Sequence, residues 1–303
     1  MIVLNLIVVL FVPFLMMGII KKTKAFWAGR KGVSLLQPLY DTIRLFKKDF
    51  VISTTTSAVF TIAPIVTFCS VVFASAFVPL LNGTILVNVQ AGFVIFAYIL
   101  GAGKFFSLIG AMDTGSSFEG MGASREACFT TIVEPAFFII LASIMVVTGN
   151  CTFDSVVTII NASEGYGLLI TVMAVISLML MILIEGSRVP VDDPATHLEL
   201  TMIHEVMILD NSASDLAFLT WGNSIKMLLL SSIIVNLLLP PGLPILIALL
   251  LYLAIIFAIA IIIGTIESAF ARIRMNRVFE FVFVMNSIAF VVLALTLANG
   301  FGG

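Results

Sequence analysis

Residues 243–268, LPILIALLLYLAIIFAIAIIIGTIES, decide the fold class of this chain. Their only charged residue is Glu267, next to the last position. A predominantly apolar run of about 20 residues is long enough to cross the hydrocarbon core of a bilayer as a helix. The stretch therefore predicts a transmembrane helix that reaches the membrane edge at Glu267.

Apolar stretches of this kind recur along the whole chain, which is 61% hydrophobic and 11% charged over 303 residues. They predict eight spans, at about 2–20, 55–79, 85–109, 126–148, 166–186, 213–239, 243–268 and 279–299. No polar segment between them is long enough for a soluble domain. We therefore expect an all-α integral membrane protein, with residues 1–303 forming one polytopic domain.

The cations indicate how this domain is oriented. Of the 15 Lys and Arg residues, 13 follow spans 1, 3, 5 and 7, and the other two, Lys104 and Lys226, lie within spans. The positive-inside rule places these odd-numbered loops in the cytoplasm and both termini outside. The first apolar stretch has its basic residues after it rather than before it, so we interpret it as a span and not as a cleavable signal.

The cysteines exclude several cofactors. Cys69, Cys128 and Cys151 have no C-x-x-C spacing, so alone they hold neither an iron–sulfur cluster nor a structural zinc. We expect no cofactor or metal in this chain, and no nucleic acid as a partner. Any electron carriers of a redox assembly would lie in other subunits.

The segment after the first span is amphipathic. Leu35, Leu36, Leu39, Ile43 and Phe46 follow helical spacing, with polar residues on the opposite face, among them Asp41 and Arg44. The pattern begins a few residues after Arg30 in the sequence. It predicts a helix lying in the membrane interface. It serves either as an anchor in the lipid headgroups or as one wall of a cavity or docking surface.

Ionisable residues also occur within the spans. Lys104 lies in span 3, and span 4 carries Arg125 at its start and Glu134 farther inside. A charge inside a bilayer is costly, so each should face a partner or water. Glu134 either forms an ion pair with Lys104 that joins two helices or belongs to a proton relay.

The segment 185–210 concentrates ionisable groups, with six of the chain's 17 carboxylates and both histidines. Asp193-Pro194 is typical of a helix start and predicts a short cytoplasmic helix after span 5. His197, His204 and Glu205 then share one face of that helix, and Glu199 falls on its apolar face. Burial there would raise the pKa of Glu199 and suit it to proton transfer.

A metal site on this helix is not expected. Residues seven apart stand about 10 Å apart along a helix, which is too far for His197 and His204 to share one ion. We interpret the two histidines as contacts to a partner subunit. The basic residues after Glu267, namely Arg272, Arg274 and Arg277, either set the topology or bind an acidic partner surface.

Four blocks of this sequence resemble subunit 1 of respiratory complex I and the related membrane subunits of energy-converting [NiFe] hydrogenases and formate hydrogenlyase. They are Gly29-Arg30-Lys31-Gly32 with Leu36-Gln37-Pro38 and Asp41, Asp113 to Ser116 with Gly122 to Glu126, Glu185 to Leu200, and Glu267 to Arg274. Arg125 and Glu134 keep the family's nine-residue spacing. Val33 replaces the family's usual proline, and Ala195 and His197 stand where complex I subunits carry glutamates. The Asp113 to Glu126 block and the segment from Asp193 to Glu205 resemble the hydrogenase branch in particular.

The resemblance implies a membrane subunit, multi-pass in the inner (cytoplasmic) membrane, that carries a peripheral electron-transfer arm. The arm's large, small and iron–sulfur subunits would hold the clusters and the [NiFe] centre, and antiporter-like subunits would adjoin the chain in the lipid bilayer. Family carboxylates at the positions of Glu134, Glu185, Asp192 and Glu199 would link redox chemistry to ion movement. Their charge partners or docking residues would be Arg30, Asp41, Arg44, Lys104, Arg125, Arg188, His197, His204, Glu205, Glu267, Arg272 and Arg274.

We therefore expect a non-redox membrane anchor and coupling subunit of a complex I-like oxidoreductase, of the hydrogenase or formate hydrogenlyase type. One alternative is the quinone-binding subunit of respiratory complex I, in which the same loops wall a quinone chamber. Another is a standalone transporter, although the sequence carries no inverted repeat. A purely structural anchor is the third alternative.

Overall fold

The computed structural model describes residues 2–80, 85–89, 91–148, 166–193, 202–239 and 243–300. Within these ranges all regular structure is helical. The helices are α1 (Ile2–Trp27), α2 (Gln37–Phe46), α3 (Ala58–Ala74), α4 (Gly92–Asp113), α5 (Ser117–Thr148), α6 (Tyr166–Glu185), α7 (His204–Met207), α8 (Ala213–Leu238), α9 (Ile245–Ala269) and α10 (Met275–Gly300). The expected all-α membrane fold is confirmed.

Seven helices are long and apolar enough to cross a membrane, namely α1, α4, α5, α6, α8, α9 and α10. The remaining predicted span corresponds to α3, an apolar helix of 17 residues. Helix α3 is shorter than the predicted 55–79: it begins after Ser57, whose side chain accepts a hydrogen bond from the Val59 N–H, and it ends at Ala74. At 1.5 Å per residue it is about 26 Å long, close to the thickness of a hydrocarbon core.

Helix α8 forms the centre of the bundle. It packs against α1, α2, α3, α6 and α9. In its most apolar stretch 72% of the residues are buried, a larger share than in any other candidate span of the described residues. Several of its polar side chains bond to carbonyls of the bundle, as an apolar surrounding requires. Ser231 and Ser232 donate to carbonyls one turn back, and Asn236 donates to the Pro79 carbonyl.

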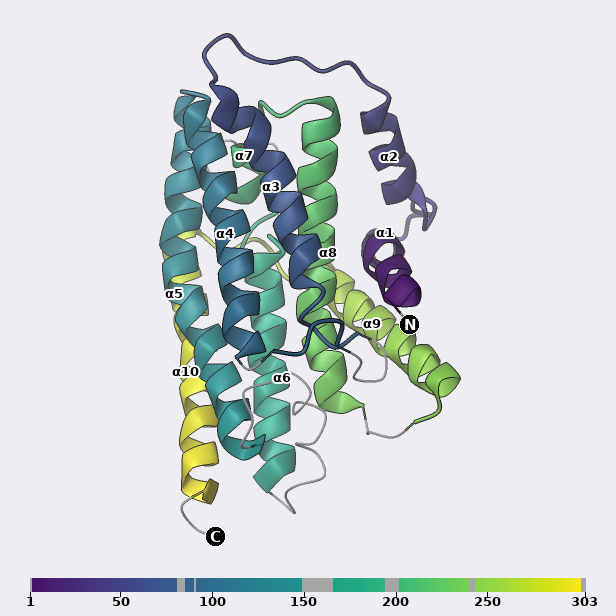
Figure 1. Ribbon diagram of the computed structural model, residues 1–303, viewed down its shortest axis with the longest axis vertical. Coiled ribbons are helices and arrows are strands. Elements are labelled where there is room, and N and C mark those ends of the chain that lie inside the picture. Colours follow the sequence, from purple (N-terminus) through teal and green to yellow (C-terminus); the bar gives the residue numbers. More distant parts are fainter. Residues whose placement is uncertain are drawn as a thin grey trace.

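The other helices surround α8 in two groups. In Figure 1, α3, α4, α5, α6 and α8 stand upright, while α9 runs obliquely and α1 is seen almost along its axis. Helices α3 and α4 pack together, as do α5 and α10, and α1 lies on α9. The amphipathic helix α2 stands beside α1 and also touches α8. Its predicted interfacial character agrees with exposed Tyr40, Ile43 and Phe46 on its surface.

Helix α5 extends beyond its predicted span. Helix α5 begins at Ser117 rather than near residue 126, so Arg125 and Glu126 lie well inside a helix of 32 residues. The helix expected from Asp193-Pro194 begins outside the described residues. In the described part after residue 201, α7 spans four residues, and Asp192 Oδ2 accepts the backbone N–H groups of Ile203 and His204, each at 3.1 Å.

Candidate functional site

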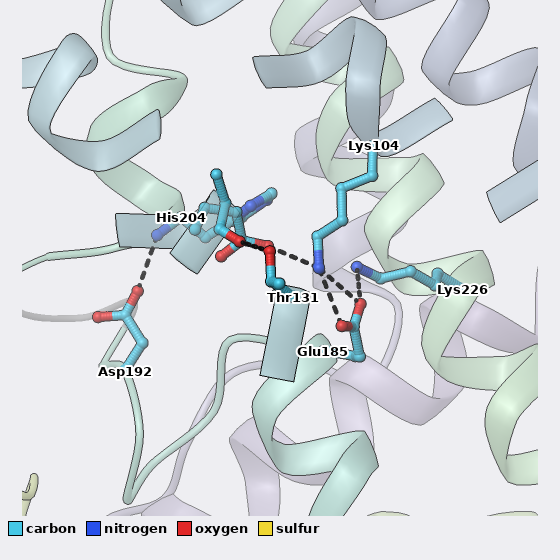
Figure 2. A network of polar contacts seen from close by, with 8 residues as sticks. Lys104, Thr131, Glu185, Asp192, His204 and Lys226 are labelled. Atoms are coloured by element: carbon cyan, nitrogen blue, oxygen red, sulfur yellow. Dashed lines mark hydrogen bonds and ion pairs between the residues drawn. The ribbon is translucent and has the colours of Figure 1, made fainter. Parts of the chain in front are cut away.

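Four charged side chains from four helices meet inside the bundle. Lys104 Nζ on α4 lies 3.0 Å from Glu126 Oε1 on α5 and 2.9 Å from Glu185 Oε1 on α6. Lys226 Nζ on α8 lies 3.3 Å from Glu185 Oε2. The side chains are only 10–16% exposed. Two cations and two carboxylates thus balance in a place where an unpaired charge would be costly, and Figure 2 shows Glu185 facing both lysines.

Two glycines allow close contacts beside the ion pairs. A Cβ at Gly186 would stand 2.9 Å from the Met227 side chain, so the end of α6 lies directly against α8 beside Lys226. A Cβ at Gly122 would overlap the Val206 side chain, so α7 lies directly on α5. Gly122 and Glu126 are four residues apart on one face of α5. The same close approach therefore brings α7 to Glu126.

The four charges line an ion-pair cavity of about 400 Å³. Its walls also contain Glu134, His204, Asn223 and apolar residues of α3, α4, α5 and α8, including Tyr98 and Phe138. Glu134 is exposed at the lateral surface of α5. Lys104 forms its ion pairs with Glu126 and Glu185, so the Lys104–Glu134 pair considered from sequence is not formed.

A second, interfacial cavity of about 570 Å³ lies between α1, α2, α8 and the chain that follows α6. Apolar side chains, among them Phe14, Ile20 and Trp221, form part of its wall. Asp41, Arg188, His204, Glu205 and Glu267 supply ionisable groups. His204 and Asn223 line both cavities and so stand between them.

The chain leaving α6 turns Arg188 inward. Ser187 adopts a left-handed conformation with φ +52°, and the Arg188 N–H donates to the Leu183 carbonyl, a common way to end a helix. Arg188 Nη1 then lies 3.3 Å from Glu267 Oε1 on α9, and Nη2 lies 2.7 Å from Met17 Sδ on α1. Lys24 Nζ reaches Glu267 Oε2 at 2.9 Å. Glu267 thus joins α1, α9 and the segment after α6.

Asp192 is the most heavily bonded carboxylate near this turn. It is 1% exposed, pairs with Arg272 Nη2 at 3.0 Å, and also accepts the Asp193 N–H. Burial raises the pKa of Asp192, while the His204 N–H and the Arg272 charge act in the opposite direction. Asp192 therefore ties the residues after α9 to the start of α7.

Burial lowers the pKa of His204 to about 4, and the positive charges of Lys226 and Lys104 add to this effect. Glu126 and Glu185 oppose it. The imidazole is consequently neutral at pH 7. A neutral imidazole carries one hydrogen-bond donor and one acceptor.

The remaining predicted residues are spread over the surface and its edges. Arg125 Nη1 donates to the Met202 carbonyl at 2.9 Å, which fixes α5 to the chain before α7. Asp41 accepts from Gln37 Nε2 at 2.8 Å, and Arg30, Arg44 and Arg274 are exposed. His197 and Glu199 lie outside the described residues. Glu205 is half-buried in the wall of the interfacial cavity.

Several members of the site were not predicted. Glu126, Lys226, Asn223 and Lys24 were absent from the expected site residues, although two signals pointed to them. Lys226 is a charge within a predicted span, which calls for a partner. Glu126 lies eight residues before Glu134 and hence on the same face of α5.

The described residues contain no group of three or more His, Cys, Asp or Glu side chains arranged to hold a metal ion. The polar chemistry that these residues offer consists of ion pairing, hydrogen bonding and proton transfer. This chemistry is concentrated where α4, α5, α6, α7 and α8 meet.

The sequence matches the family model described as NADH dehydrogenase over residues 1–297. Hydrogenase-4 component C of Escherichia coli (strain K12) is 28% identical, over 78% of this chain and 74% of that protein. Formate hydrogenlyase subunit 4 of the same organism is 24% identical, over 86% of this chain and 87% of that protein. An NADH-quinone oxidoreductase subunit of Rhodospirillum rubrum is 29% identical, over 69% of this chain and 61% of that protein.

A solved structure has the same fold. A chain in the structure of the membrane-bound sulfane sulfur reductase, an archaeal respiratory membrane complex, superposes with a TM-score of 0.82 over 97% of both chains. Sequence identity is 19%, so this likeness concerns the arrangement of the helices.

Proposed function

Because this chain belongs to the NADH dehydrogenase family, we propose that it is the membrane anchor and coupling subunit of a complex I-like, redox-driven ion-translocating assembly. The similarity to a hydrogenase-4 component and a formate hydrogenlyase subunit favours the hydrogenase or formate hydrogenlyase type. In this proposal the iron–sulfur clusters and the [NiFe] centre lie in partner subunits. The chain converts a change at its cytoplasmic loops into a change of charge inside the membrane.

One observation carries this proposal: Glu185 is shared by two lysines on different helices. Lys104 and Lys226 each depend on the same carboxylate. A proton added to Glu185 would leave two cations with only Glu126 to balance them, which is unfavourable in a buried site. Protonation of Glu185 would therefore force α4 or α8 to move, or attract another anion. Such a bistable charge cluster is suited to coupling.

Glu134 supplies a connection to neighbouring membrane subunits. It lines the ion-pair cavity and is exposed at the lateral surface of the isolated chain. A carboxylate facing lipid at this depth costs several kcal/mol, so a polar partner or water should cover it. We assign this face of α4 and α5 to an adjoining ion-translocating subunit.

The cytoplasmic side supplies the connection to the electron-transfer arm. Arg30, Arg44 and Arg274 are exposed there and are available to an acidic docking surface. Arg272 holds Asp192, and Asp192 holds the backbone of α7. Movement of a docked subunit against these residues would therefore be transmitted to α7 and to the ion-pair cavity. Glu199 is assigned to the same relay on its resemblance to the family.

The test compares two glutamate variants in the native assembly. Glu185→Gln removes the shared charge, whereas Glu280→Gln changes an exposed carboxylate on α10 and serves as the matched control. We expect Glu185→Gln to lower the number of ions moved per electron at least tenfold, and Glu280→Gln to leave it unchanged. Ion uptake and electron transfer are measured together in membrane vesicles. Normal ion uptake per electron in Glu185→Gln would overturn the coupling role.

Purification from native membranes in a gentle detergent tests the assembly itself. Mass spectrometry should identify a [NiFe]-hydrogenase-like large subunit, iron–sulfur proteins and antiporter-like subunits. Recovery of the chain alone and active would favour a standalone transporter.

The interfacial cavity favours one second candidate, the quinone-binding subunit of a respiratory complex I. Its volume of about 570 Å³, its apolar wall at Phe14 and Trp221 and its buried Arg188 suit a ligand with an apolar ring and polar oxygens. Quinone extracted from the purified assembly, together with nicotinamide-oxidising flavoprotein subunits, would establish this candidate. Activity that resists quinone-site inhibitors would exclude it.

A further inference from the structure

His204 and Asn223 form a shared wall between the ion-pair cavity and the interfacial cavity, since both residues line both spaces. They come from α7 and α8, which lie at the boundary between the two cavities. On one side stand the charges of Lys104, Glu185 and Lys226, as Figure 2 shows. On the other side stands Glu205, the residue after His204. A proton or water molecule that passes between the cavities at this boundary contacts His204 and Asn223.

Asn223 has an unmet hydrogen-bonding need at this boundary. Its side-chain oxygen, Oδ1, is buried and has no hydrogen-bond partner among the described residues. A buried amide oxygen without a donor is destabilising and is rare in folded proteins. The donors that fit between two polar cavities are a water molecule and the N–H of a neutral imidazole. Asn223 Oδ1 is therefore suited to accept a hydrogen bond from a water that also contacts the His204 ring and orients it.

Charges from four helices act on His204. Lys104 on α4, Glu126 on α5, Glu185 on α6 and Lys226 on α8 all act on its ring. Asp192 binds its backbone N–H and so fixes the position of the residue. Burial keeps the ring neutral at pH 7, with its pKa lowered to about 4. A neutral ring accepts a proton at one nitrogen and releases another from the second nitrogen, without keeping a charge.

We propose that His204, oriented by Asn223, carries protons between the interfacial cavity and the ion-pair cavity. A proton from water or Glu205 binds the unprotonated ring nitrogen, and the proton on the other nitrogen passes to Glu126 or Glu185. The ring returns to its first tautomer by rotating or by exchanging protons with water. Only N–H and O–H bonds form and break, and no oxidant or reductant takes part. The inference rests on the proposed coupling function, for which it supplies a path.

The first experiment replaces residues on and off the boundary in the native assembly. His204→Gln keeps a polar side chain but removes the proton carrier, and Asn223→Leu removes the orienting oxygen. Ser231→Ala is the matched control, because Ser231 lies about two turns farther along α8 and lines neither cavity. We expect His204→Gln to slow ion uptake about a hundredfold, within the range for loss of an acid–base group, and Asn223→Leu to slow it less. Ser231→Ala should have no effect.

The second experiment separates a proton carrier from a structural residue. His204→Ala opens space in which added imidazole can replace the lost ring. We expect imidazole to restore ion uptake in His204→Ala, with a dependence on pH that follows the neutral form of the added base. Imidazole should not restore Glu185→Gln. Loss of uptake in His204→Ala that imidazole does not restore would overturn the proton-carrier role.

The outcomes distinguish this inference from the proposed function. If His204→Gln couples normally while Glu185→Gln does not, the path through His204 is wrong and the coupling role stands. If both variants couple normally, both proposals fail. If both lose coupling and imidazole rescues only His204→Ala, both are supported.

Discussion

At the scale of single residues, the balance of charge around Glu185 determines how the buried cluster responds to substitution. With all four side chains present, Lys104, Lys226, Glu126 and Glu185 sum to zero. Any single neutralisation leaves one uncompensated charge in a buried place. Removal of one cation and one carboxylate together restores neutrality, and Lys104 then keeps Glu126 as its partner.

The expected result is a strongly non-additive pair of substitutions. Lys226→Met alone and Glu185→Gln alone should each destabilise the folded chain by about 3–5 kcal/mol, as expected when one partner of a buried ion pair is removed. The double variant should be much less destabilised than the sum of the two. Thermal unfolding of the purified assembly, measured for all four members of the cycle, checks this. Simple additivity would show that the two residues do not interact.

A second residue-scale prediction concerns pH and His204. Its pKa is about 4 in the folded chain, against an ordinary value of 6.5. Between these values the unfolded chain binds more protons, so this residue makes the free energy of unfolding fall as the pH drops from about 6.5 to about 4. Asp192, whose pKa is raised by burial, acts in the opposite direction, since its stabilising contribution is greatest below its ordinary pKa of 3.8.

Comparison with His204→Gln isolates the histidine's contribution, because Asp192 is present in both proteins. The wild-type melting temperature should fall more steeply than that of His204→Gln between pH 6.5 and 4.5. The change in the free energy of unfolding that His204 contributes is at most about 3 kcal/mol, because a shift of one pKa unit corresponds to 1.36 kcal/mol. Parallel melting curves over this range would contradict the lowered pKa of His204.

At the scale of elements, hydropathy was sufficient to predict where helices cross the membrane but not how they end. The apolar runs located α6, α8 and α9 closely, because burial in lipid requires little beyond length and apolarity. Hydropathy does not predict that α5 begins at Ser117. Asp192 accepts the N–H groups of Ile203 and His204, which lie 11 and 12 residues later in the chain, and no local pattern predicts these bonds.

The same limit explains which site residues could be predicted. Charges in spans were recognisable one by one, since each is costly in lipid. Their partners were not, because pairing depends on which faces of α4, α5, α6 and α8 meet. The close contacts of Gly122 with α7 and of Gly186 with α8 belong to this packing, and the sequence around a glycine does not show which helix it will contact.

The contact between α5 and α7 can be tested with one substitution that disturbs it and a second that compensates. Gly122→Ala would place a methyl group against Val206 and should push α7, and with it His204, away from Glu126. Ion uptake per electron should fall severalfold, and the second substitution Val206→Ala should restore much of it by removing the obstructing side chain. Gly120→Ala is the control, because nothing lies within 4 Å of a Cβ there. Failure of Val206→Ala to rescue would argue that the defect arises elsewhere.

At the scale of the whole molecule, the number of membrane crossings depends on α3. Seven helices meet the length expected of a span, and α3, with 17 residues, lies at the lower limit. If α3 crosses, the chain has eight spans and both termini lie on the same side. If α3 does not cross, the termini lie on opposite sides. The positive-inside rule favours the first case, with the cation-rich loops in the cytoplasm and both termini outside.

Reporter fusions at the two ends decide between these arrangements. An alkaline phosphatase that is active only outside the cytoplasm should be active at both ends, and a fluorescent protein that folds only inside should be dark at both. The same reporters inserted into the exposed segment 47–52, between α2 and α3, serve as the control and should give the reverse result. Fluorescence at one terminus and phosphatase activity at the other would mean that α3 does not cross. The ion-pair cavity, whose wall includes Thr67 and Val71 of α3, would then lie nearer the membrane surface than proposed.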